Sequence, residues 1–142
     1  MSPTRCITLL MLVLLLAGCG QQSADERLNQ SLTQLQEAIE SRSADQLVAR
    51  LHPDFMANQQ YDRDWARRTA SLLFLQNQRV NLLVISQQTS IDPVYTGQAR
   101  TQAQINLSGA QRFIPDSTRL YSVTLNWLEE DGEWLLHRLT WE

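Results

Sequence analysis

The C-terminal stretch Tyr121–Glu142, YSVTLNWLEEDGEWLLHRLTWE, alternates apolar and polar residues on both sides of Asp131 and Gly132. Such alternation is typical of half-buried strands, in which successive side chains point to opposite faces. The Asp-Gly pair is typical of a tight hairpin turn. We therefore predict that the chain ends in two antiparallel strands that share an apolar inner face.

The length of the turn decides which residues of this hairpin meet. A two-residue turn at Asp131-Gly132 would place Leu125 opposite Arg138. A three-residue loop that also includes Glu130 shifts the pairing and gathers the large apolar groups on one face, so we predict this register. Its pairs are Trp127 with Leu135, Val123 with Leu139, Tyr121 with Trp141 and Leu125 with His137.

The same register predicts an apolar outer face on the last strand. Its outward side chains would be Trp134, Leu136 and Arg138, which is more apolar than a solvent-exposed face needs. One hypothesis is therefore a structural role, in which Trp134 and Leu136 dock on a larger assembly.

The central part of the chain predicts further strands and loops. Alternation over Ala99–Leu107 predicts a half-buried strand, and the apolar run Leu82–Ile85 predicts a strand that is covered on both faces. We interpret Asp54–Tyr61 and Ser108–Ser117 as loops.

Two capping boxes predict the starts of helices. Ser23 with Glu26, and Ser43 with Gln46, can each close free backbone N–H groups at a helix start. An apolar stripe over Leu28–Ile39 follows the first box at helical spacing. Because the stripe is short, we expect it to pack on the protein's own sheet rather than form a coiled coil with a partner.

A third helix is predicted to begin at Asp62 or Asp64, either of which can cap it. Trp65 lies in its first turns. The run Leu72–Leu75 is apolar on every side of this helix, so we expect its C-terminal end to be enclosed.

Helices followed by a twisted sheet predict the fold class: an α+β domain with N-terminal helices packed in a strongly curved antiparallel sheet. The junction Leu51–Phe55 and the closing strand Asp131–Leu136 resemble the nuclear transport factor 2-like superfamily, and small bacterial lipoproteins of it in particular. The resemblance covers Gln34–Glu142. Its other shared features are the Phe74-Leu75 segment, a loop with Gly109 and Pro115, and the final Trp141-Glu142 pair.

This resemblance, to folds also called ketosteroid-isomerase-like cones, implies a cone-shaped cavity between helices and sheet. It also implies a possible homodimer formed through the sheet face. It does not fix an activity, because the fold hosts isomerases, dehydratases, binding modules and scaffolds.

The N-terminal segment is typical of a lipoprotein signal peptide. Arg5 precedes the apolar run Ile7–Ala17, which is shorter than the about 20 residues that cross a membrane. The run ends in Leu16-Ala17-Gly18-Cys19, which resembles the bacterial lipobox, whose cysteine is acylated and becomes the new N-terminus. The predicted divisions are a signal peptide at 1–18, a lipidated N-terminus and short tether at 19–25, and one domain at 26–142.

Acylation of Cys19 would fix where the protein resides. Each buried methylene contributes about 0.8 kcal/mol, so two or three acyl chains, palmitate for example, hold a protein to a bilayer. With Gly20 after the cysteine, the resemblance implies an outer-membrane protein facing the periplasm. The alternative is an ordinary secretory signal that contains a cysteine.

Composition excludes several classes of function. Without Arg5 the mature chain carries 11 Lys and Arg against 15 Asp and Glu, a net charge of −4. With no basic run and no Gly-rich phosphate loop, we expect no nucleic-acid partner. The spacing of His and Cys predicts no metal site and no cofactor, and no Gly-x-Ser-x-Gly nucleophile motif occurs.

An isomerase-like activity would need a carboxylate base and a neutral donor in an apolar pocket. The candidates are Asp54, Tyr61 and His137. Asp54 can instead bond loop amides, and His137 can be a satisfied core histidine. His52, at the end of the second helix, is interpreted as a partner of the last helix carbonyls.

The predicted ligand pocket includes Trp65, Tyr121, Trp127 and His137. We favour a non-catalytic envelope lipoprotein that binds a small apolar ligand or a protein partner. Two alternatives stay open: a ketosteroid-isomerase-like or dehydratase-like enzyme, and a structural accessory of an envelope complex. An open cavity would favour ligand binding or catalysis, whereas a cavity filled by aromatic side chains would favour the accessory role.

Overall fold

The computed structural model describes residues 22–108 and 120–142. The predicted leader at 1–18, the predicted acylation site Cys19, and the predicted loop residues Gly109 and Pro115 lie outside the described residues. Within the described ranges, no helix is long and apolar enough to cross a membrane.

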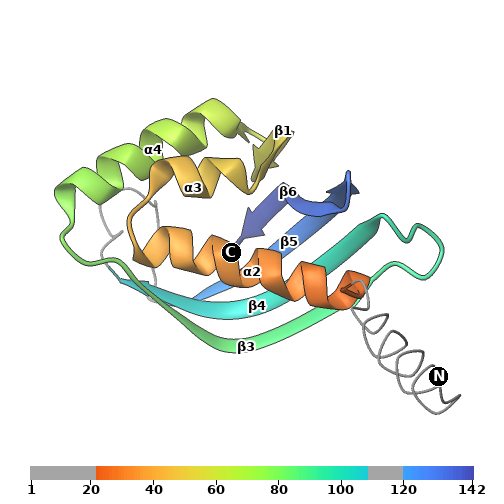
Figure 1. Ribbon diagram of the computed structural model, residues 1–142. Coiled ribbons are helices and arrows are strands. Elements are labelled where there is room, and N and C mark those ends of the chain that lie inside the picture. The colour runs from red at the N-terminus through yellow and green to blue at the C-terminus, as the bar shows by residue number, and fades with distance from the viewer. Residues whose placement is uncertain (1–21, 109–119) are drawn as a thin grey trace, which may run out of the picture.

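The described chain folds as helices packed in the hollow of a curved sheet (Figure 1). The elements are α2 (Ala24–Glu40), α3 (Ala44–Ala49), β1 (Leu51–Ala57), β2 (Tyr61–Asp62), α4 (Arg63–Gln76), β3 (Asn81–Ile91), β4 (Gln98–Ser108), β5 (Tyr121–Glu130) and β6 (Glu133–Trp141). The strand order in the sheet is β2-β1-β6-β5-β4-β3. The helix α2 lies across the concave face, and α3 and α4 cover one end of it (Figure 1). The predicted α+β class is confirmed.

Side-chain caps begin all three described helices. The Ser23 hydroxyl accepts a hydrogen bond from the backbone N–H of Glu26 at 3.2 Å, and Ser43 caps α3 in the same way. Asp62, rather than Asp64, caps α4, where its carboxylate accepts from the N–H of Trp65 at 2.8 Å. Each cap satisfies a backbone donor that has no partner within the helix.

The final hairpin has a two-residue turn, so the predicted three-residue loop is wrong. Asp131 and Gly132 both have positive φ, 51° and 79°, and the glutamates on either side of them pair directly. Such a turn matches the right-handed twist of the strands. As a result Trp127 pairs with Leu136 and not with Leu135.

A bulge at His137 then changes the register of β6. Trp127 pairs with Leu136, whereas Asn126 pairs with Arg138, so His137 is left without a partner strand residue. The extra residue reverses which side chains point inward beyond it. The observed pairs Leu125 with Leu139 and Val123 with Trp141 replace the predicted pairs of Val123 with Leu139, Tyr121 with Trp141 and Leu125 with His137.

Because the two-residue turn pairs Leu136 with the inward-facing Trp127, the predicted apolar outer face of the last strand is also wrong. Trp134 is 0% exposed and Leu136 is 2% exposed, so neither side chain is available for docking. Trp134 is further held by its indole N–H, which donates to the carbonyl of Ala24 at 3.2 Å. The structure therefore contradicts the hypothesis that the protein docks on a larger assembly through Trp134 and Leu136.

The segment predicted as a loop after Pro53 is mostly strand. Residues Leu51–Ala57 form β1, which runs parallel to β6, so the sheet is mixed rather than wholly antiparallel. Phe55 and Ala57 are buried, whereas Asp54, the residue before Phe55, is exposed. The pairing shifts register between Leu51 and Met56, which accommodates a proline that has no N–H to donate.

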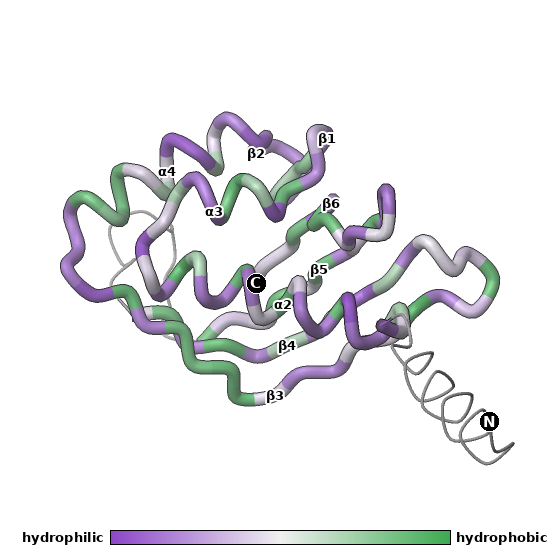
Figure 2. Tube along the Cα trace, in the orientation of Figure 1, coloured by the Kyte–Doolittle hydropathy of each residue, from purple (hydrophilic) through white to green (hydrophobic). Residues whose placement is uncertain are grey.

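Two apolar runs that we predicted to be enclosed reach the surface instead. Leu75 at the end of α4 is 83% exposed and Leu83 on β3 is 62% exposed. Within the run 82–85, Leu82 and Val84 line the cavity, whereas Leu83 between them points to the opposite face of the sheet. Figure 2 shows that the apolar stretches of α4 and β3 lie at the same end of the molecule. Leu72 and Ile85 are likewise exposed.

Candidate functional site: an apolar cavity

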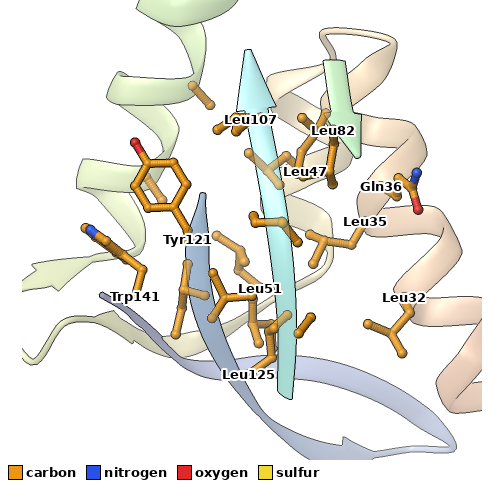
Figure 3. A pocket seen from close by; sticks show the side chains of 18 of the residues that line it. Leu32, Leu35, Gln36, Leu47, Leu51, Leu82, Leu107, Tyr121, Leu125 and Trp141 are labelled. Atoms are coloured by element: carbon orange, nitrogen blue, oxygen red, sulfur yellow. The ribbon is translucent and has the colours of Figure 1, made fainter. Parts of the chain in front are cut away.

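A cavity of about 370 Å³ lies between the helices and the concave face of the sheet. Its size is within the range of about 300–1,000 Å³ that is usual for small-molecule sites. Leucines of α2, α3, β1 and β4 point into the same space (Figure 3). Both the helical layer and the strands therefore contribute to its wall.

The described wall of the cavity carries no Asp, Glu, His, Lys or Arg side chain. Its surface is mainly aliphatic and aromatic. A charged group placed there would lose its hydration without gaining an opposite charge. The polar side chains along the wall are Gln36, Tyr61, Trp65, Thr69, Gln87, Thr101, Tyr121 and Trp141.

Three aromatic rings gather at one part of the wall. Tyr61 stacks on Trp65 with ring centroids 4.4 Å apart, and Trp141 lies 6.1 Å from Tyr61 and 6.4 Å from Trp65. The three planes are nearly parallel, with angles of 26° or less. All three side chains are partly exposed. They form an aromatic cluster on the wall, against which another ring or chain can pack.

Tyr121 brings a polar group to this apolar wall. The residue is 6% exposed, and its hydroxyl has no hydrogen-bond partner among the described residues. The hydroxyl points toward α4 (Figure 3). It is therefore free to donate a hydrogen bond to a ligand or to water.

Comparison with known proteins identifies the fold. No protein-family model matches the sequence, and no curated protein matches it significantly. Among solved structures, an NTF2-like protein from Cytophaga hutchinsonii matches with a TM-score of 0.68 at 12% identity, covering 84% of this chain and 98% of that one. An NTF2-like protein of unknown function from Pseudomonas putida KT2440 matches with a TM-score of 0.68 at 11% identity, covering 87% and 89%.

The chain has a nuclear transport factor 2-like fold. The resemblance drawn from the junction after α3 and from the closing strand is thus confirmed for the fold. At these identities the likeness says nothing about activity. A further match, to an NTF2-like family protein from Streptomyces avermitilis with the provisional name of a dehydratase, has a TM-score of 0.60 at 14% identity and covers 82% and 92%.

Of the four residues predicted for the pocket, the fold places Trp65 and Tyr121 on the cavity wall. Trp127 faces inward but does not reach the cavity. It is 1% exposed, and its indole N–H donates to the Thr101 hydroxyl at 3.1 Å. Trp127 therefore fills the core near the β5–β6 turn instead of lining the site.

The predicted inward position of His137 is wrong, because His137 is the bulge residue. It lies against His52, with ring centroids 5.0 Å apart, and not on the cavity wall. Burial lowers the pKa of His137, and the charge of Arg138 lowers it further, while the carboxylates of Asp54 and Glu130 act against this shift. These surroundings keep the imidazole neutral to lower pH, but they do not bring it to the site.

Asp54 and His52 contact each other on β1 outside the cavity. The backbone N–H of Asp54 donates to Nδ1 of His52 at 3.0 Å, so Nε2 carries the hydrogen that is donated to Glu130 Oε1 at 2.7 Å. The expected contact of His52 with helix carbonyls is wrong, because His52 is a residue of the strand. Of the three catalytic candidates, the cavity wall includes Tyr61 alone.

Sequence reasoning missed Thr101, which is 1% exposed and reaches the cavity from β4. Its hydroxyl also pairs with the hydroxyl of Thr89 at 3.0 Å. A signal was present, because Thr101 occupies an inward position of the alternating stretch between Ala99 and Ala103. Among the residues that the structure describes, no group of three or more His, Cys, Asp or Glu side chains could hold a metal ion.

Proposed function

We propose that the protein binds a small, uncharged, apolar ligand in this cavity, and that acyl chains on Cys19 hold it at the bacterial cell envelope. The observation that carries the proposal is the combination of cavity volume with a wall whose described residues include no acidic or basic side chain. Burying apolar surface contributes roughly 25 cal/mol per Å², whereas a buried unpaired charge is costly. Such a wall selects neutral apolar molecules over charged ones.

The aromatic surface and the Tyr121 hydroxyl add some selectivity. Tyr61, Trp65 and Trp141 offer ring faces, and Tyr121 offers one donor. A ligand with a flat apolar body and one hydrogen-bond acceptor fits these groups best.

Catalysis is the second candidate function. Two tyrosine hydroxyls on the wall favour it, as do fold relatives with provisional enzyme names, such as the dehydratase of Streptomyces avermitilis and an aromatic ring hydroxylase of Novosphingobium aromaticivorans. The isomerase-type chemistry also needs a carboxylate base in the pocket. Asp54 is exposed outside the cavity and His137 lies at the bulge, so we favour binding without catalysis.

The proposed anchor would keep the domain close to the membrane surface. The helix α2 begins at Ala24, a few residues after Cys19. Attachment to the outer membrane, facing the periplasm, remains part of the proposal. So does a homodimer or a protein partner at the sheet, for which the exposed Leu83 and Ile85 of β3 offer an apolar surface.

A cavity-filling variant tests the binding proposal. Ala103 lies on the cavity wall, so Ala103→Phe should occupy the space and weaken binding of the neutral fluorescent probe N-phenylnaphthylamine by about tenfold or more. The matched control is Gln102→Phe, since Gln102 is the neighbouring exposed residue of β4. Fluorescence titration of both variants measures the effect. Equal probe affinity in the two variants would contradict the proposal.

A further inference from the structure

We propose that a second pocket, between α2 and the β5–β6 turn, binds a phosphate group. The pocket has a volume of about 250 Å³ and shares no lining residue with the apolar cavity. Its wall is polar and includes two arginines, Arg27 and Arg50. It lies on the other side of α2, so it is separate from the proposed ligand site.

Arg50 supplies a cation whose charge is not neutralised. It follows α3 as the C-cap residue, and its Nη1 donates to Oε1 of Gln34 at 2.8 Å. Among the described residues no carboxylate lies within ion-pair distance of Arg50. The remaining guanidinium donors are therefore available to an anion in the pocket.

Ser31 supplies a hydroxyl beside that cation. The residue is 5% exposed and lines the pocket, yet its hydroxyl has no hydrogen-bond partner within the described ranges. A serine or threonine in a helix commonly donates to the carbonyl one turn earlier, as Thr33 does to Asn29 at 3.0 Å. The Ser31 hydroxyl is therefore available to donate to an occupant of the pocket.

Arg27 brings a second guanidinium to the same wall. Its Nη2 pairs with Glu129 Oε2 at 3.1 Å, and its Nη1 reaches the carbonyl of Gln22 at 3.4 Å. Its Nε is buried and has no partner among the described residues. Arg27 is thus only partly satisfied by its protein neighbours, although Glu129 offsets its charge.

A phosphate group matches this set of donors. It presents acceptor oxygens in several directions, so a guanidinium, a hydroxyl and the amides of Gln30 and Gln34 can all donate to it. Glu133 also lines the pocket and opposes an anion. This opposition gives the proposal a second test, since removal of the carboxylate should strengthen binding.

The phosphate could belong to a lipid headgroup or to a soluble molecule. Gln22 lines the pocket and lies three residues after Cys19. If Cys19 is acylated, as we propose above, Gln22 lies three residues from the lipid anchor, so a headgroup of the same membrane is one source of the phosphate. The chemistry of the pocket is the same for both sources.

The first experiment titrates the full chain with inorganic phosphate and follows binding by calorimetry. Arg50→Gln should weaken phosphate binding by about tenfold or more, and Ser31→Ala should weaken it measurably. Glu133→Gln should strengthen it. Arg68→Gln, which removes an exposed arginine on α4, is the charge-matched control and should bind as the wild type does.

The second experiment identifies the source of the phosphate. The Cys19→Ala chain, with and without Arg50→Gln, is sedimented with vesicles of phosphatidylglycerol or of phosphatidylcholine. Sedimentation with phosphatidylglycerol that needs Arg50 assigns a lipid headgroup, whereas phosphate binding that needs Arg50 without sedimentation assigns a soluble phosphate. The proposal is overturned if Arg50→Gln and a folded Ser31→Ala both bind inorganic phosphate and phosphatidylglycerol vesicles in the same way as the control Arg68→Gln.

Discussion

Single side chains decide where the polar groups of the interior lie. Thr101 is 1% exposed, and its hydroxyl serves both the indole of Trp127 and the hydroxyl of Thr89. It thereby satisfies a tryptophan N–H that would otherwise be buried without a partner. His137 lies instead at the bulge on β6, where burial lowers the pKa of its imidazole.

Replacing the Thr101 hydroxyl should destabilise the fold. Thr101→Val keeps the shape of the side chain but leaves the Trp127 N–H without an acceptor, so we expect a loss of about 1–3 kcal/mol in the free energy of unfolding. Thr140→Val changes an exposed threonine of β6 and should alter stability by less than about 0.5 kcal/mol. Urea denaturation of both variants checks this, and equal losses would refute the role of the hydroxyl.

The depressed pKa of His137 predicts a pH dependence of stability. At a pH below 6.5, the usual pKa of histidine, His137 takes up a proton more readily in the unfolded chain than in the folded chain. The stability that depends on the neutral imidazole is therefore complete above that pH, and it is lost as the pH falls through the folded pKa. His137→Gln should lose less stability than the wild type between about pH 7 and about pH 5. Denaturation curves at the two pH values measure this. An equal loss of stability in the wild type and in His137→Gln would show that His137 does not cause the pH dependence.

Secondary-structure elements show where reasoning from sequence succeeds and where it fails. The caps of the helices and the alternation of β4 and β5 are local signals, and the structure contains these elements. The bulge at His137 and the parallel pairing of β1 with β6 depend on contacts between distant segments. No local pattern around Pro53 indicates that a neighbouring strand will pair there.

The turn between β5 and β6 makes a prediction for one element. Gly132 has a φ of +79°, which L side chains rarely adopt, although a Cβ would meet nothing within 4 Å. Gly132→Ala should therefore cost about 1 kcal/mol through backbone strain alone. Gly97→Ala has equally open surroundings and no such φ, so it should be close to neutral. Thermal unfolding of the two variants separates strain from crowding.

For the whole molecule, the sequence was sufficient to predict the fold class and part of the site. Trp65 and Tyr121 lie on the cavity wall, and their places follow from helix capping and strand alternation. The positions of Trp127 and His137 depend on the depth of the cavity and on the bulge, which only the assembled sheet defines. The exposure of Leu83 likewise follows from its place on the face of β3 opposite the cavity.

The cavity as a whole supports one central claim, that the domain holds a small uncharged apolar molecule. Native mass spectrometry of the purified chain tests this claim most directly, because it reports a retained ligand and the oligomeric state together. We expect an added mass on the wild type that extraction with organic solvent identifies as a neutral apolar compound, and no such mass on Ala103→Phe. An added mass that persists in Ala103→Phe, or a wild type that carries none and also fails to take up the neutral probe, would contradict it.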